Sequence, residues 1–285
     1  MARLGNCSCI WTLLFALIFP LCSVGWTQTV DATTEVPNRP LTPEQTAVFT
    51  AVRNQSTTQP AMKLNMSLAN PEGQPNPEFG KPNANFLKLH ESFLKRKQEP
   101  IGVLFIGDSI TQGWVKASSL WNERYGRYAP ANFGIGADRI EHVLWRIEHG
   151  ELDQIEPKLV VLLIGTNNIG KSADEIAAGV RAVVAAIRAK VPKAQLLVLG
   201  LFPRGASASK AGKAAPFREK LMAVNADLAK LDDGHQVRYL EIWKPFLDSE
   251  DSIPADVMPD GLHPNEKGYK IWADAMQPLF DEMMR

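Results

Sequence analysis

Four short apolar runs, separated by longer segments with a helical pattern, constrain the fold of this chain more than any other feature. Runs of this length that are apolar throughout are typical of parallel strands with both faces buried. The segments between them carry apolar residues on one face, as crossover helices do. We therefore expect a three-layer α/β/α domain. The runs cover 103–106, 159–164, 195–201 and 237–242, and the expected helices cover 138–149, 172–191, 217–231 and 266–284.

The composition is that of a globular protein and gives no sign of a polyanionic partner. Hydrophobic residues make up 45% of the chain and charged residues 22%, enough for a sizeable core. Lys and Arg together number 31, as do Asp and Glu, so the formal net charge is zero. Because nucleic-acid binding usually requires a clearly basic face, we expect no nucleic-acid partner.

The first 25 residues have the pattern of a secretory signal peptide. Arg3 precedes an apolar run over 10–21, and the small residues Ser23 and Gly25 follow it. The run is shorter than the roughly 20 residues that a membrane-spanning helix needs, so we expect no stable span, the alternative being a permanent anchor. We expect an exported protein, located in the periplasm, the cell envelope or the medium. All three cysteines lie in this segment, so the mature chain would have no disulfide: Cys7, Cys9 and Cys22.

The remaining chain divides into two parts by composition. Residues 26–84 are rich in Thr, Asn, Gln and Pro and show little sustained periodicity, which is typical of a loosely structured arm or linker. The alternation of apolar runs and helical segments begins after that point. We expect one folded domain over 85–285.

Polar clusters follow two of these apolar runs and one shorter segment. In open α/β sheets, ligands bind outside the carboxyl ends of the strands. Gly107-Asp108-Ser109 follows the first run, a glycine turn over 134–138 follows Ala131 to Phe133, and Gly165-Thr166-Asn167-Asn168 follows the run over 159–164. Ser109 at such a turn is a candidate nucleophile, with capping of the next helix as the alternative.

A fourth cluster, Asp260-Gly261-Leu262-His263-Pro264, precedes the last expected helix. A serine nucleophile needs a base to take its proton, and the base needs a carboxylate that orients it. His263 and Asp260 can supply both from one loop. The sequence therefore favours Ser109, His263 and Asp260 as nucleophile, base and orienting acid.

These four blocks, in this order, resemble those of the SGNH/GDSL hydrolase superfamily from about residue 85 to the C-terminus. Within it, the chain most resembles the catalytic (alpha) subunits of intracellular platelet-activating-factor acetylhydrolase. That likeness is carried by 132–136, 142–146 and 200–205. The resemblance implies a flavodoxin-like sheet of five parallel strands, a preference for small acyl groups such as acetyl, and a homodimer as a possible assembly.

The resemblance also implies an oxyanion hole. Its donors would be the backbone N–H of Ser109, the side-chain amide of Asn167 and the N–H of Ala137, where such enzymes often have glycine. Alanine can donate equally well, provided that the turn does not require a positive φ; Gly136 is the fallback donor. Asp108 is expected to bond the backbone of its turn. No cofactor is implied, and the scattered histidines give no metal motif.

The expected function is that of an exported serine esterase, which hydrolyses small acyl esters through an acyl-enzyme, with acetylated carbohydrates as candidate substrates. An α/β-hydrolase is disfavoured because Thr111 replaces the second glycine of Gly-x-Ser-x-Gly. A noncatalytic glycan-binding module and an acyltransferase that uses the same serine remain alternatives. Four aromatic residues could line a sugar site or lie in the core: Trp114, Trp121, Trp145 and Tyr269.

Overall fold

The computed structural model of the protein describes residues 84–205 and 215–285. The predicted signal peptide (1–25) and all but the last residue of the predicted arm (26–84) lie outside these ranges. Within the described ranges, no helix combines the length and apolar content needed to cross a membrane. Strands and helices alternate in this order: α2 (Ala84–Arg96), β1 (Val103–Gly107), α3 (Ser109–Gln112), α4 (Ser118–Tyr125), β2 (Pro130–Gly134), α5 (Ile140–Glu148), β3 (Leu159–Leu163), α6 (Ala173–Lys190), β4 (Gln195–Leu199), α7 (Ala215–Leu228), β5 (Val237–Leu240) and α8 (Glu266–Met283).

The five strands form one parallel sheet in the order β2-β1-β3-β4-β5, which confirms the predicted flavodoxin-like fold. Every residue of β1 and β3 is buried, as expected for strands covered on both faces. Gly107 at the end of β1 pairs with Gly134 of β2 and with Leu163 of β3. The three strands therefore end at the same level, and the loops that follow them leave the sheet side by side.

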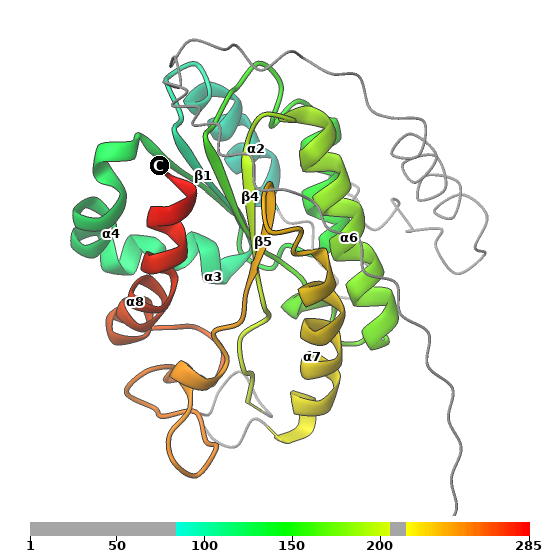
Figure 1. Ribbon diagram of the computed structural model, residues 1–285, viewed down its shortest axis with the longest axis vertical. Coiled ribbons are helices and arrows are strands. Elements are labelled where there is room, and N and C mark those ends of the chain that lie inside the picture. The colour runs from blue at the N-terminus through cyan, green and yellow to red at the C-terminus, as the bar shows by residue number, and fades with distance from the viewer. Residues whose placement is uncertain (1–83, 206–214) are drawn as a thin grey trace, which may run out of the picture. The chain divides into compact units, whose positions relative to one another are not determined.

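Helices cover both faces of this sheet, with α4 and α8 on one side and α6 and α7 on the other (Figure 1). The α8 side is largely aromatic: Phe105, Trp114, Tyr125, Trp272 and Phe280 are all buried and form edge-to-face or tilted ring contacts. The α6 side is aliphatic, because the buried residues of α6 are mainly valine, isoleucine and alanine. The sheet therefore lies between two chemically different layers.

Some strands and helices have other ends than the sequence predicts. The run over 195–201 leaves the sheet at Leu199 because the side chain of Asn225 takes over both backbone groups of Leu201: it accepts from the N–H at 2.7 Å and donates to the carbonyl at 3.0 Å. The helix predicted from Asp138 begins at Ile140 instead. Asp138 closes a turn, since its N–H donates to the carbonyl of Ile135 at 3.2 Å.

A test of the packing at the carboxyl edge is Gly134→Ala. A Cβ atom at Gly134 would lie 2.2 Å from the backbone nitrogen of Gln112, which rigid main chain cannot accommodate. We expect a loss of about 1–3 kcal/mol in the free energy of unfolding, measured by urea denaturation. The control is Gly170→Ala, because a Cβ there meets nothing within 4 Å. Equal midpoints for the two variants would contradict the close approach of β2 and α3.

Candidate active site

Ser109 is presented at the carboxyl end of β1 by a capped turn. The strand ends at Gly107, and Ser109 is the first residue of the short helix α3. Asp108 caps this helix, since its Oδ1 accepts a hydrogen bond of 2.9 Å from the N–H of Ile110. The expected structural role of Asp108 is thus observed, and the cap leaves the hydroxyl of Ser109 facing the C-terminal loop.

The structure brings Ser109, His263 and Asp260 together in one chain of hydrogen bonds. The distance between Ser109 Oγ and His263 Nε2 is 2.9 Å, and that between His263 Nδ1 and Asp260 Oδ2 is 2.6 Å. Because a carboxylate accepts, the geometry fits the tautomer in which Nδ1 carries the proton and Nε2 accepts from the serine hydroxyl. The serine therefore has a base within reach of its proton.

Asp260 is fixed by its own loop. Its Oδ1 accepts from the backbone N–H groups of Leu262 at 3.0 Å and His263 at 2.7 Å. Burial alone would raise the pKa of Asp260, but the hydrogen bonds from the side chain and backbone of His263 and from Leu262 outweigh it and hold this pKa below its ordinary value. The carboxylate is thus ionised at neutral pH and can stabilise a protonated imidazole.

The turn over 135–138 runs beside the serine. The N–H of Asp138 closes this turn, and Ala137 has a φ of 65°. The sequence-based assignment of Ala137 as a donor depends on a turn that does not require a positive φ there, and this condition is not met. The turn does require a positive φ at Ala137, as at the third position of a type II turn. Alanine adopts it at a cost of roughly 1 kcal/mol. The turn bond does not use the N–H of Ala137. A Cβ built on Gly136 would lie 4.0 Å from the Cβ of Ser109.

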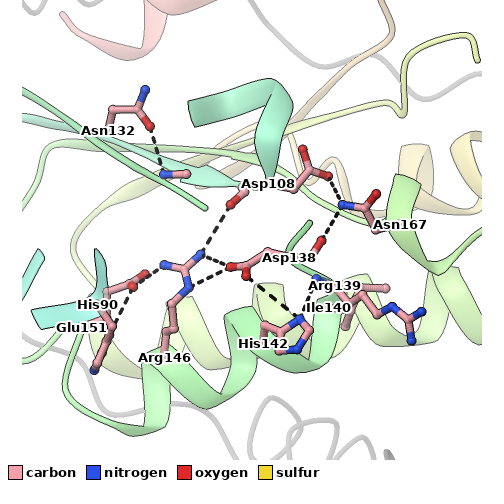
Figure 2. Close-up of polar contacts among 12 residues, drawn as sticks. His90, Asp108, Asn132, Asp138, Arg139, Ile140, His142, Arg146, Glu151 and Asn167 are labelled. Carbon is pink, nitrogen blue, oxygen red and sulfur yellow. Dashed lines mark hydrogen bonds and ion pairs between the residues drawn. The ribbon is translucent and has the colours of Figure 1, made fainter. Parts of the chain in front are cut away.

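Asn167 lies in the 3₁₀ turn Thr166–Asn168 that follows β3. Its Nδ2 donates to the backbone carbonyl of Asp138 at 2.8 Å and makes a long contact of 3.5 Å with Asp108 Oδ2 (Figure 2). The side-chain amide therefore spans the loops after β1 and β2. The neighbouring Asn168 holds the loop itself, because its amide donates to Glu141 Oε2 at 2.9 Å and accepts from the N–H of Ile140 at 3.1 Å.

Burial changes the protonation of Asp108. Its side chain is 1% exposed, and desolvation raises its pKa to about 7, against the opposing effects of the Ile110 N–H and the charge of Arg204. Arg204 is half-buried and donates to the carbonyl of Thr166 at 2.8 Å. A titrating carboxyl therefore lies directly beside the candidate nucleophile.

Sequence reasoning missed a cluster of buried ionisable side chains next to the site, which we call the ionic cluster: Asp138, Arg146 and Glu151. All three side chains are at most 1% exposed. One signal was available, since Arg146 lies three residues after Val143 and adjoins Ile147, on the face of α5 that is otherwise apolar. Two candidate sugar-binding aromatics, Trp114 and Tyr269, are core residues, at 1% and 0% exposure.

One hollow lies apart from this site. A hollow of about 510 Å³ is formed by α7 and the segment after β5, and its lining includes Met222, Tyr239, Trp243 and Leu247. None of the predicted site residues lines it. In the described ranges, no group of three or more His, Cys, Asp or Glu side chains is arranged to hold a metal ion.

Comparison with known proteins finds one matching family and several relatives of this chain. The sequence model of the GDSL-like Lipase/Acylhydrolase family matches residues 105–271. The platelet-activating factor acetylhydrolase IB subunit alpha1 of Homo sapiens is 38% identical over 178 residues, which are 62% of this chain and 74% of that protein. The alpha2 subunit of Rattus norvegicus is 38% identical over 191 residues, 67% of this chain and 79% of that protein. A GDSL-like lipase structure from Bacteroides thetaiotaomicron covers 70% of this chain and 98% of its own, with a TM-score of 0.53 and 20% identity.

The raised pKa of Asp108 predicts how stability changes with pH. In the folded protein this pKa is about 7, against an ordinary value of 3.8, so between these values only the unfolded chain releases the proton. Raising the pH from 4 to 7 therefore lowers the free energy of unfolding, by up to roughly 1 kcal/mol per pH unit. Asp108→Asn keeps the cap acceptor and removes this contribution. We expect the parent to lose stability relative to the variant over this pH range, as measured by urea denaturation. A difference in the free energy of unfolding that stays constant with pH would contradict the prediction.

Proposed function

Because the chain belongs to the GDSL-like lipase/acylhydrolase family and is an ester-hydrolysing enzyme, we propose that it is a serine esterase for small acyl groups, acetyl in particular. The observation that carries this proposal is the chain of hydrogen bonds from Ser109 through His263 to Asp260, at 2.9 and 2.6 Å. The acetyl preference is supported by the relatives, which are named acetylhydrolases.

In the first half of the reaction, Ser109 Oγ attacks the acyl carbonyl carbon while His263 Nε2 takes the hydroxyl proton. Asp260 keeps the imidazole in the required tautomer and stabilises the imidazolium. The C–O bond to the alcohol then breaks, the alcohol leaves with the proton from His263, and the acyl group stays on Ser109. In the second half, His263 activates water, which attacks the acyl-enzyme and releases the acid.

The oxyanion formed in each half would be bound by three N–H donors. They are the backbone N–H groups of Ser109 and Ala137 and the side-chain amide of Asn167. The bond between Asn167 Nδ2 and the Asp138 carbonyl supports this assignment, because it fixes the amide beside the turn that contains Ala137. The second N–H of the amide makes only a long contact of 3.5 Å and is available to the substrate oxygen.

Export is a further part of the proposal. It is supported by the signal-peptide pattern of the first 25 residues, and an exported esterase for acetyl groups would find its substrates among acetylated carbohydrates outside the cell. The relatives are named as subunits, which supports an assembly of more than one chain, and a homodimer is the assembly that we propose.

The first test is hydrolysis of p-nitrophenyl acetate, butyrate and octanoate by the chain from Trp26 onward. We expect the rate to fall as the acyl chain lengthens, and Ser109→Ala to lower kcat for the acetate at least about 1000-fold without changing the circular dichroism spectrum. The control is Ser119→Ala, which removes an exposed serine of α4. Absence of activity on all three esters would favour the glycan-binding alternative, and full activity of Ser109→Ala would place the nucleophile elsewhere.

The role of Asn167 has a test of its own. Asn167→Ala removes one oxyanion donor, and loss of such a donor commonly lowers kcat about 100- to 1000-fold. We expect a loss of this size with a KM within threefold of the parent, because the donor acts on the transition state. An unchanged kcat would remove Asn167 from the oxyanion hole.

The signal-peptide assignment predicts where the mature chain starts. Expression of the full sequence in a secreting host should give a product that begins at or near Trp26, as measured by mass spectrometry of the exported protein. Deleting residues 1–25 should keep the protein inside the cell. A product that retains Arg3 after export would contradict cleavage.

A further inference from the structure

Arg146 is a fully buried arginine whose guanidinium group joins three parts of the chain (Figure 2). Its Nε and Nη2 both lie 3.0 Å from Asp138 Oδ2. Its Nη1 pairs with Glu151. Its Nη2 also lies 3.4 Å from the carbonyl of Gly107, two residues before Ser109. One planar group therefore contacts the end of β1, the turn after β2 and the segment after α5.

Asp138 connects this guanidinium to the expected oxyanion donors through its backbone. Its N–H closes the turn that contains Ala137, and its carbonyl accepts the 2.8 Å hydrogen bond from Asn167 Nδ2. The side chain of Asp138 points the other way, into the ionic cluster (Figure 2). Both donors outside the nucleophile turn are thus held by the same residue that Arg146 binds.

We propose that Arg146 is a positioning residue of the active site: by binding Asp138 and reaching the carbonyl of Gly107, it holds Ala137 and the side-chain amide of Asn167 in place for the oxyanion. This inference rests on the esterase function proposed above. Arg146 does not touch the substrate, and its effect on the reaction is transmitted through Asp138.

The chemistry of the guanidinium explains why an arginine fills this place. The group is planar and has five N–H donors in fixed directions, so it can bind Asp138, Glu151 and Gly107 at once. A lysine ammonium has the same charge but lacks this fixed planar arrangement. The contact with Asp138 also stabilises the turn over 135–138. This turn needs support because Ala137 has a backbone conformation that alanine disfavours.

Helix α2 closes the ionic cluster from the outside. The ring of Phe93 stacks on Phe133 with 4.5 Å between centroids, and the guanidinium carbon of Arg146 lies 5.7 Å from the centre of the Phe93 ring. His90 Nδ1 lies 3.9 Å from Glu151 Oε2. This helix precedes residues 105–271, which the family model matches. Helix α2 therefore covers the ionic cluster, which keeps water away from it and strengthens its electrostatic interactions.

The test compares two conservative variants on opposite sides of the same guanidinium. Arg146→Lys keeps the charge but not the planar contacts, and we expect kcat for p-nitrophenyl acetate to fall 10- to 100-fold with a KM within threefold of the parent. The matched control is Glu151→Gln, which keeps an oxygen acceptor for Arg146 and leaves Asp138 bound. We expect the unfolding midpoint of this variant to fall about as far as that of Arg146→Lys, while its kcat stays within threefold of the parent.

A double-variant cycle separates positioning from general loss of stability. If Arg146 acts on the donors, the factor by which Arg146→Lys lowers kcat must be at least threefold smaller in the Asn167→Ala background than in the parent. The reason is that one donor is already absent from that background. Should Arg146→Lys fail to fold, Asp138→Asn enters the same cycle with the same expectation. Asp138→Asn keeps the backbone groups of the turn but weakens the interaction of residue 138 with Arg146.

The outcomes are distinct. Three results would overturn the positioning role while Ser109-dependent hydrolysis stands. The first is a parent-level kcat in Arg146→Lys, and the second is an equal fall in kcat in both backgrounds. The third is a kcat that falls in Glu151→Gln as far as it does in Arg146→Lys. Parent-level activity in Ser109→Ala would instead overturn the esterase mechanism itself. Smaller losses in the Asn167→Ala background, with KM and the Glu151→Gln kcat preserved, support the inference.

Discussion

The candidate active site depends on the level at which three neighbouring parallel strands end. Gly107, Gly134 and Leu163 are paired across the sheet, so the loops that carry Ser109, Ala137 and Asn167 leave it at one edge. Hydrogen bonds then join the loops to each other: the N–H of Ile135 donates to the carbonyl of Gly107 at 3.2 Å, and Asn132 Nδ2 donates to the carbonyl of Thr111 at 2.8 Å. A register shift of one residue would separate these groups, which is why sheet pairing and site geometry cannot vary independently.

The histidine reaches this edge from the opposite end of the domain sequence. Ser109 and His263 are 154 residues apart, and the last helix brings them together. Tyr269 of α8 is fully buried and donates from its hydroxyl to the carbonyl of Ile110 at 2.7 Å, directly beside the nucleophile. The loop of His263 is held a second time, because the N–H of Gly205 donates to the carbonyl of Gly261 at 2.7 Å. The aromatic layer under α8 therefore fixes the position of the base as well as stabilising the fold.

The sequence predicts four of the five strands, the crossover helices and the three residues that meet at the site, because each leaves a local pattern. Strand β2 has no such apolar run, and a fifth strand follows only from the family resemblance. Apolar runs report strands, and Ser109, Asp260 and His263 stand in short polar blocks at strand or helix ends. What the sequence does not report are interactions between distant segments. Leu201 reads as part of a strand because its burial is local, whereas the hydrogen bonds from Asn225 that end the strand come from α7. The positive φ of Ala137 and the pairing of Arg146 with Asp138 likewise follow from the packing of loops.

Several features that lower stability lie around the nucleophile, and their presence there has a physical reason. Asp108, Asp138, Arg146 and Glu151 are buried, and Ala137 is in a left-handed conformation, so each carries a cost that an apolar core with glycine turns would avoid. An oxyanion forms and disappears during catalysis, and donors that must reorganise around it give up much of their effect. Buried polar contacts resist reorganisation because breaking any one of them leaves an unpaired group in a medium without water. The same burial that lowers the stability of this region is what can keep its donors fixed.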